Sequence, residues 1–539
     1  MREEPSLGSV EGLAASQRWP AAAAWLRGGA FTWKELLVLL VLGAIANLYF
    51  LSTLSVSIDD ELAAVRSNHG VWLAQGRYTI YLIESWLVPQ PAVPFSPYLL
   101  LVLCLALSHM LLVRAHGYAV SWKTYAAFPA FVTSPVLWLI SEFAANVPAL
   151  GLGLLAVALA VHVLCDHSPR IFAPAGWRRT ACAALLLTFA AGAYQSLLVL
   201  FVTAMAGVAL VHCQRSELAS RELLRPLLRG AVQTVLCACV AGVLYLLINK
   251  TALALLDTGS SKYVEKFFQP HNLTAPLWLA HALLMSALKI YAGSATVFGA
   301  TLWAAGPLLA VACACVLATA RRKLLPLAAL LVLVLGAPFL LHLAAATPDL
   351  PMRTVVALPY IAWLTALLVL HARQSQLAAA GALLLALYQL QVINLTSQYT
   401  AAATIAQAAE RHTALALGAR LAELAPPGET PPAIILDTYG HLLESHQTVY
   451  ATAPTNTTAG SHFGWDKGNL QRVVAFMKIM GHPGIQAMPP EQRGANTAQF
   501  EQMPVWPRAG SVVRDGDRYL VKLGPSADAA HGGPATPPH

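Results

Sequence analysis

Long apolar runs alternate with short polar loops from Glu35 to about Leu395. A run of roughly 20 apolar residues is long enough to cross a hydrocarbon core about 30 Å thick as an α-helix. The pattern therefore predicts a mainly α, polytopic membrane protein with about eleven transmembrane helices. The predicted spans are residues 35–56, 98–113, 125–140, 147–164, two short passes within 180–213, 230–248, 297–319, 324–345, 355–370 and 377–395.

The segment 180–213 is too long for one ordinary span and is basic at both ends, with Arg178 and Arg179 before it and Arg215 after it. Loops rich in Lys and Arg stay in the cytoplasm. Two short passes that meet near residues 193–196 satisfy this rule, and their turn presents Tyr194 and Gln195 on the outer side. By the same rule we expect the apolar segment 277–291 to be interfacial or re-entrant.

The distribution of Lys and Arg predicts a cytoplasmic N-terminus and an exported C-terminus. We expect a cytoplasmic tail at 1–34, a membrane domain at 35–396 with an outer loop at 57–97, an extracytoplasmic α/β domain at 397–524, and a disordered tail at 525–539. In the exported domain, residues 401–424 and 469–480 read as helices, and residues 433–436 and 519–523 read as strands.

Composition supports a membrane protein, because only 11% of the 539 residues are charged and 57% are hydrophobic, with a mean hydropathy of +0.59. Soluble domains are typically about 25% charged. The net charge of +8 does not indicate a nucleic-acid partner, since the basic residues are dispersed between apolar runs. The eight cysteines lie between Cys104 and Cys315 without a C-x-x-C motif, and we interpret them as packing residues.

Three consecutive acids, Asp59, Asp60 and Glu61, follow the first predicted helix. Their proximity should raise the pKa of at least one of them. A carboxylate in this position can accept a proton from an attacking hydroxyl. The alternative is a solvated acidic helix end that helps to fix the export boundary.

Other polar residues are predicted on the outer side of the membrane. Arg77 can bind a phosphate through its planar guanidinium, or it anchors the loop at the interface or pairs with the three acids. Arg353 suits a lipid phosphate or the interface in the same way, and Lys262 suits a phosphate or a lipid headgroup. Glu142 either caps the fourth helix or joins Tyr194 and Gln195 near a substrate. The histidines in the apolar runs show no metal-ligand spacing, so no metal site is predicted.

Six segments, in this order, resemble the bacterial type II glucosyltransferase family of O-antigen modification. They are "SIDDE", "WLAQGRY", "VPQPAVPFSP", "GAYQS", "MRTVVALPY" and "AGSHFGWDKGNLQRVVAFMKIMG". The resemblance spans most of residues 35–484.

The resemblance implies a C-type glycosyltransferase fold in the bacterial inner membrane. It also implies transfer of glucose from a polyprenyl phosphate donor to a glycan acceptor, usually the O-antigen of lipopolysaccharide, at the periplasmic face. Asp59, Asp60 and Glu61 are then the catalytic element, Arg77, Arg353 and Lys262 face the donor phosphate, and Tyr194, Gln195 and Glu142 face the sugar or acceptor. No cofactor is required, although adjacent carboxylates suit Mg²⁺ or Mn²⁺. The alternatives are a flippase for a lipid-linked sugar, a transferase for another sugar, and a glycan polymerase or ligase.

Overall fold

The computed structural model describes residues 32–165, 176–259, 261, 267–320, 323–425, 434–442, 448–454 and 457–525. The predicted tail 1–34 lies outside this part of the chain except for its last three residues, and the predicted tail 525–539 lies outside it except for Pro525. Lys262 lies outside the described residues as well.

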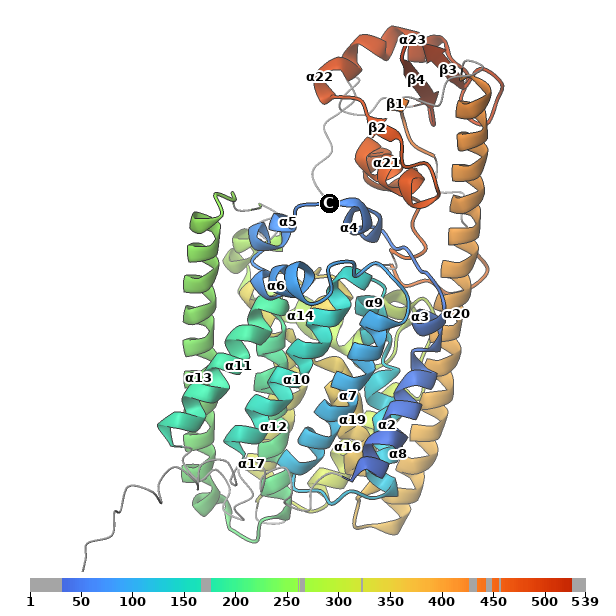
Figure 1. Cartoon of the computed structure of the whole chain (residues 1–539). Helices are drawn as coiled ribbons and strands as arrows, with labels where there is room; N and C mark the ends of the chain where they lie inside the picture. Colours follow the sequence, from blue (N-terminus) through green and yellow to red (C-terminus); the bar gives the residue numbers. More distant parts are fainter. Residues whose placement is uncertain are drawn as a thin grey trace, which may run out of the picture.

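The described chain is mainly helical, as predicted, and its longer helices run side by side as a bundle (Figure 1). The bundle helices are α2 (Trp33–Ala46), α3 (Leu48–Ser52), α7 (Ser96–Ala115), α8 (Trp122–Val132), α9 (Pro135–Ser141), α10 (Val147–Leu164), α11 (Trp177–Ala193), α12 (Leu197–Arg215), α13 (Ser220–Leu255), α14 (Pro276–Tyr291), α15 (Ala295–Phe298), α16 (Ala305–Leu317), α17 (Leu324–Gly336), α18 (Leu340–Ala344), α19 (Leu358–Leu370) and α20 (Ser375–Glu423).

Six helical segments in the described part of the chain are long and apolar enough to cross a membrane, or seven if the bent pair α8–α9 is one span. The length and composition of the described helices therefore do not confirm the predicted number of about eleven spans. Several predicted spans are interrupted. The first divides at Asn47, whose side chain donates to the carbonyl of Gly43 over 3.0 Å, and the eighth divides at Gly299, where φ is +79°.

A proline explains the bend in the third predicted span. Helices α8 and α9 meet at 52°, and Pro135 is the first residue of α9. Proline disfavours the helical conformation in the residue before it, and Ser134 adopts φ −50° and ψ 131°. By contrast, the predicted division of 180–213 is observed, because α11 ends at Ala193 and α12 begins at Leu197.

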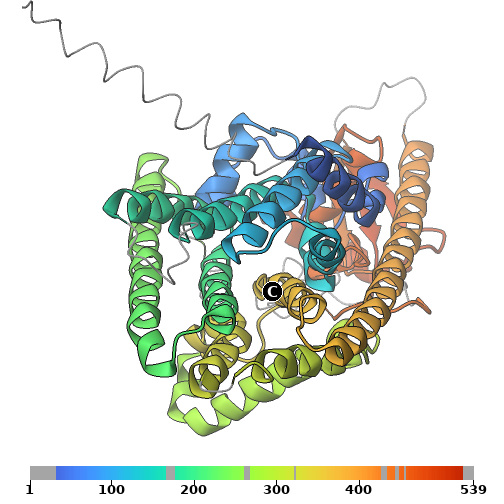
Figure 2. The ribbon, with the colours of Figure 1, turned by 90° about the horizontal axis from the view of Figure 1, so that it is seen from below.

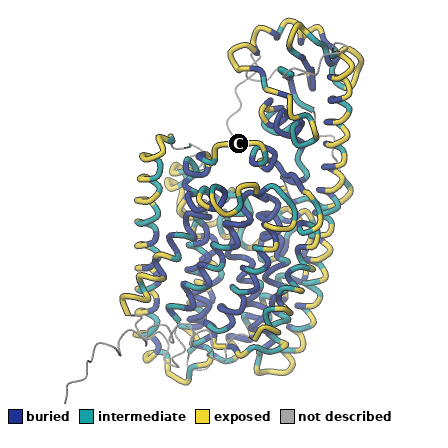
Figure 3. Tube along the Cα trace, in the orientation of Figure 1, coloured by how far each residue is buried: buried dark blue, intermediate teal, exposed yellow. Residues whose placement is uncertain are grey.

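Helices α13 and α20 lie on opposite sides of the bundle (Figures 1 and 2). The bundle interior is buried, whereas α13 is largely exposed along its length (Figure 3). Its exposed side chains include large apolar ones such as Val232, Leu236, Val243 and Leu247. A wide apolar surface of this kind is unfavourable in water and suits lipid, so these helices indicate a membrane protein.

The predicted boundary near residue 396 does not interrupt the chain. Helix α20 runs from Ser375 to Glu423 without a break and joins what were predicted as two helices. It leads to a four-stranded sheet of order β2-β1-β4-β3, in which β1 is parallel to β2 and β4, and β3 is antiparallel to β4. The elements of this part are β1 (Ile434–Tyr439), α21 (Leu470–Ile479), β2 (Ile485–Ala487), α22 (Pro490–Arg493), α23 (Thr497–Gln502), β3 (Val512–Asp515) and β4 (Arg518–Lys522).

Between α3 and α7 the chain forms three short helices that lie across one end of the bundle, on the side of the C-terminal sheet (Figure 1). They are α4 (Asp60–Val65), α5 (Gly70–Ala74) and α6 (Tyr78–Trp86). This is the predicted loop 57–97. Helix α21 packs against α4, so a late segment of the chain lies directly on this early one.

Candidate active site

A cavity of about 580 Å³ lies between α4, α5 and the bundle end on one side and the C-terminal part of the chain on the other. We call it the polar cavity. It is lined by Ile58, Asp59, Asp60, Leu62, Arg66, Val71, Trp72, Gln75, Arg77, Ile140, Phe143, Ala145, Asn146, Tyr194, Phe267, Pro351, Arg353, Pro454, Thr457, Trp465, Asp466 and Arg472. Five of the nine predicted site residues are among them: Asp59, Asp60, Arg77, Tyr194 and Arg353.

Asp59 is the N-cap residue of α4, and it is held in a strained backbone conformation. Its φ is +86°, in the left-handed region that aspartate tolerates better than most side chains. Such residues persist where the surrounding structure fixes them, and they often occur at functional sites. The side chain of Asp59 is 59% exposed and lines the polar cavity, so a substrate can reach its carboxylate.

Asp60 also lines the polar cavity, but it is almost completely buried. Its Oδ2 accepts hydrogen bonds from the backbone and hydroxyl of Ser57 and from the backbone of Ala144, at 3.0–3.3 Å, and its Oδ1 accepts one from Ala145. Burial raises the pKa of Asp60 to about 8, although these hydrogen bonds act to lower it. Asp60 therefore ties the acidic turn, residues 59–61, to the short 3₁₀ helix Ala144–Asn146 that precedes α10.

Glu61 is fully buried and does not line the cavity. Its Oε1 accepts a hydrogen bond from Nη1 of Arg472 over 2.5 Å. Its Oε2 lies 3.5 Å from Nδ1 of His462. The three acids thus have different surroundings, which the sequence alone does not distinguish.

The arginines of the cavity also differ. Arg77 lies against the rings of Trp72 and Tyr194, at 5.7 and 5.1 Å from their centroids. It forms no ion pair with any residue that the structure describes. Arg353 lies 5.0 Å from the ring centroid of Phe143. Arg66, in contrast, forms a bidentate ion pair with the buried Glu84, in which Nε donates to Oε1 and Nη2 donates to Oε2, each over 2.8 Å.

Two predicted site residues lie behind the cavity wall. Gln195 donates to the backbone carbonyl of Gln75 over 3.2 Å and to the hydroxyl of Tyr245 over 3.1 Å, and it thereby supports the turn that leads to Arg77. Glu142 is fully buried, and its two oxygens accept hydrogen bonds from the backbone and hydroxyl groups of Thr457 and Thr458. Burial raises its pKa to about 7, against the effect of these bonds.

The residues that the C-terminal part contributes to the cavity, chiefly Trp465, Asp466 and Arg472, were not predicted from the sequence. They belong to the segment "GWDKGNLQR", which is part of the resemblance to the glucosyltransferase family, but the resemblance implied no role for any of its residues. The hydropathy pattern did not identify Arg472 as a site residue, because many short amphipathic helices carry one arginine in their first turn. Only the contact between α21 and α4 brings Arg472 to the acidic turn.

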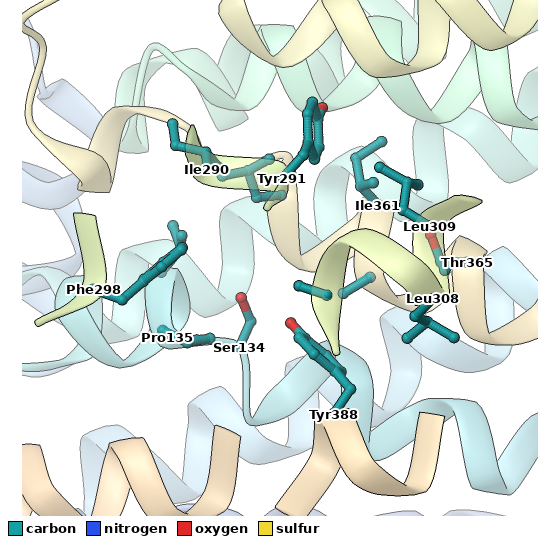
Figure 4. A pocket seen from close by; sticks show the side chains of 14 residues that line it. Ser134, Pro135, Ile290, Tyr291, Phe298, Leu308, Leu309, Ile361, Thr365 and Tyr388 are labelled. Carbon is teal, nitrogen blue, oxygen red and sulfur yellow. The ribbon is translucent and has the colours of Figure 1, made fainter. Parts of the chain in front are cut away.

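A second, apolar hollow of about 80 Å³ lies among helices of the bundle (Figure 4). Pro135 and Val136 of α9 line it, whereas Ile140 near the other end of α9 lines the polar cavity. The hydroxyl groups of Ser134 and Tyr388 face the same space within it (Figure 4). Residues of one short helix, α9, therefore line both spaces.

No group of three or more His, Cys, Asp or Glu side chains suited to a metal ion occurs in the described part of the chain. Asp59, Glu61 and Asp466 all bind Arg472. These carboxylates are therefore directed at a guanidinium group.

The chain was compared with known families and proteins. A family model described as glucosyl transferase GtrII matches residues 48–370, and no curated protein or solved structure matches the chain. The matched range contains all nine predicted site residues and ends before the segment that carries Arg472. Because this range covers well over half of the 539 residues, the chain belongs to the GtrII family of glucosyl transferases.

Proposed function

We propose that the protein transfers glucose from polyprenyl phosphate glucose to a glycan acceptor, the O-antigen of lipopolysaccharide, at the periplasmic face of a bacterial inner membrane. One observation supports this most directly. The polar cavity combines an accessible carboxylate, Asp59, with the guanidinium groups of Arg77 and Arg353, at the end of a bundle of apolar helices. A donor with a lipid chain, a phosphate and a sugar needs these three surroundings together.

Arg77 and Arg353 suit the donor phosphate. Arginine binds phosphate through parallel N–H donors in a fixed geometry. As the bond between C1 and the phosphate oxygen breaks, negative charge develops on the phosphate, and preorganised cations stabilise it. The rings of Trp72 and Tyr194 restrict the guanidinium of Arg77, so little reorganisation is needed.

The lipid chain would leave the polar cavity along α9 and enter the apolar hollow. The hollow is bounded mostly by apolar side chains of α14, α16 and α19. Its volume admits part of one isoprenoid chain and no headgroup, and the remaining chain would lie in the surrounding lipid.

Asp59 would act as the general base. The acceptor oxygen attacks C1 of glucose, the bond from C1 to the phosphate oxygen breaks, and the polyprenyl phosphate leaves with the electron pair. Asp59 takes the proton of the acceptor hydroxyl. Its Oδ2 accepts no hydrogen bond from any described residue, and its Oδ1 is held by Arg472 over 2.7 Å. Direct displacement of this kind inverts the configuration at C1.

The other predicted residues would act around this centre. Tyr194 lines the cavity beside Arg77 and would contact the sugar. Asp60, Gln195 and Glu142 would hold the turn, the loop before Arg77 and the C-terminal segment in place. We propose no metal step, because Arg472 already provides the positive charge beside the carboxylates.

The orientation follows from the distribution of basic residues, which supports a cytoplasmic N-terminus and a periplasmic C-terminal part. The polar cavity would then open towards the compartment in which lipid-linked sugar and lipopolysaccharide meet.

The purified protein in proteoliposomes, given polyprenyl phosphate [¹⁴C]glucose and O-antigen, tests the proposal. We expect label in the glycan with inverted configuration at C1. Movement of labelled lipid between leaflets without transfer would instead identify a flippase, and transfer from a diphosphate-linked or nucleotide-linked sugar alone would refute the proposed donor.

A further inference from the structure

The guanidinium of Arg472 is the centre of a buried ionic cluster. Nη2 donates to Asp59 over 2.7 Å, Nη1 to Glu61 over 2.5 Å, and Nε to Asp466 over 2.7 Å. Each of its nitrogen atoms therefore binds a different carboxylate. Two of these carboxylates belong to the acidic turn, and the third belongs to the C-terminal segment itself.

Burial alone would lower the pKa of Arg472, but the three carboxylates outweigh it, and the net effect raises that pKa further above its ordinary range. The guanidinium is therefore a permanent cation. Three carboxylates around one cation leave the cluster with an excess of negative charge. Of the three carboxylates, Asp59 is the most exposed to the cavity.

The segment that carries Arg472 is fastened to the membrane-embedded part at two further points. Thr457 and Thr458 donate to Glu142, at the end of α9. The backbone N–H of His462 donates to Glu410 of α20 over 2.7 Å. These contacts hold residues 457–462, at the start of this segment, in addition to the ion pairs that Arg472 forms at its end.

We propose that Arg472, supplied by the C-terminal segment beyond the range matched by the family model, is a positioning residue of the transfer reaction. It orients Asp59 towards the acceptor hydroxyl and holds the strained turn through Glu61. This inference rests on the proposed role of Asp59, and it assigns to residues 457–472 the task of completing the active site.

Arg472→Lys is the informative variant, because lysine keeps the charge but cannot reach three carboxylates with a rigid fork. Arg493→Lys is a matched control. Arg493 is equally buried, at 8% exposure for both residues, and its Nε also donates to an aspartate, Asp437, over 2.7 Å, but within the C-terminal sheet and away from the cavity. Transfer rate, donor KM and melting temperature in detergent would be measured for both variants and for Arg472→Gln.

For Arg472→Lys we expect kcat to fall about 10- to 100-fold, the scale for a misplaced catalytic group, with donor KM within about twofold of the parental value. Arg472→Gln should lose more activity than Arg472→Lys, and Arg493→Lys should keep the parental kcat whatever its melting temperature. Parental kcat in Arg472→Lys would overturn the inference. The inference would also be overturned if kcat fell in both lysine variants in proportion to the decrease in their melting temperatures.

The proposed function can fail separately. If the parental protein uses a different donor, the polyprenyl phosphate proposal is wrong, and the same comparison is made with the donor that it accepts. Complementation of a deletion strain, scored by the hexose branch on its glycan, tests the variants without any assumption about the donor.

Discussion

Oε2 of Glu142 accepts a hydrogen bond of 2.6 Å from the hydroxyl of Thr458, which lies 316 residues later in the chain. Both side chains are buried. The backbone N–H of Thr458 donates to the same oxygen over 2.9 Å. The bent pair α8–α9 and the segment over the polar cavity are therefore fastened together beside the acidic turn.

Glu142→Gln should loosen this attachment. A glutamine amide would place an N–H₂ donor opposite the N–H and hydroxyl donors of Thr457 or Thr458, and an unsatisfied buried polar group costs about 1–3 kcal/mol. We expect faster amide hydrogen exchange in residues 457–472 and a lower transfer rate. Glu423→Gln is the control, because Glu423 forms an exposed pair with Arg420. Unchanged exchange in Glu142→Gln would contradict the attachment.

Stability should fall as the pH rises from about 4 to about 8. Burial raises the pKa of Asp60 from 3.8 to about 8 and that of Glu142 from 4.5 to about 7. Between the ordinary and the raised values the folded state binds more protons than the unfolded state, so the free energy of unfolding decreases with pH. The contribution is complete below about pH 4 and is lost as the pH passes these two folded-state pKa values.

Melting temperatures in detergent at pH 5, 6, 7 and 8 check this sign. Asp60→Asn should flatten the slope up to about pH 8, and Glu142→Gln should flatten it up to about pH 7. A slope that stays the same in Asp60→Asn would show that another group is responsible.

Asp59→Asn and Asp60→Asn should separate catalysis from stability. Loss of a general base typically lowers a rate about 10²- to 10⁴-fold, so Asp59→Asn should lose that much kcat with little change in melting temperature. Asp60→Asn should lower the melting temperature, because an amide cannot accept all the donors around Asp60.

The pH dependence of the rate distinguishes the two acids independently. If Asp60 were the base, its ionised fraction and the rate would rise about tenfold for each pH unit below 8 and then level off. If the rate of the parental protein rises with a midpoint near pH 8 and this rise is missing in Asp60→Asn, then Asp60 is the base and Asp59 is not.

Arg77→Gln should raise the donor KM about 10- to 100-fold, because a hydrogen bond to a charged group contributes about 1.5–3 kcal/mol. Arg215→Gln is a matched control. Arg215 also lies against an aromatic ring, 3.8 Å from the centroid of Tyr118, but at the far end of α12 from the turn that contains Tyr194. Equal effects of the two variants on donor KM would argue against phosphate binding by Arg77.

Removal of divalent cations with EDTA should leave the transfer rate unchanged. The guanidinium of Arg472 occupies the centre of the carboxylates that are otherwise best suited to Mg²⁺ or Mn²⁺. A loss of activity that Mg²⁺ restores would contradict this prediction.

Hydropathy and charge act locally along a helix, and they were therefore sufficient to predict the membrane character, the division of 180–213 at residues 193–196, and the range of α10. It also indicated Asp59, Asp60, Arg77, Tyr194 and Arg353, which share one cavity. The span count did not follow, since the bend at Pro135 and the breaks at Asn47 and Gly299 depend on backbone geometry that apolar composition does not encode.

Which of the three acids is accessible and which are buried depends on the folded arrangement and could not be predicted from the sequence. Asp59, Asp60 and Glu61 are adjacent in the chain, but a positive φ at Asp59 turns successive side chains to different surroundings. The partner of two of these acids, Arg472, lies more than 400 residues away. Contacts over such a distance arise from packing of the whole chain, and no local pattern of residues records them.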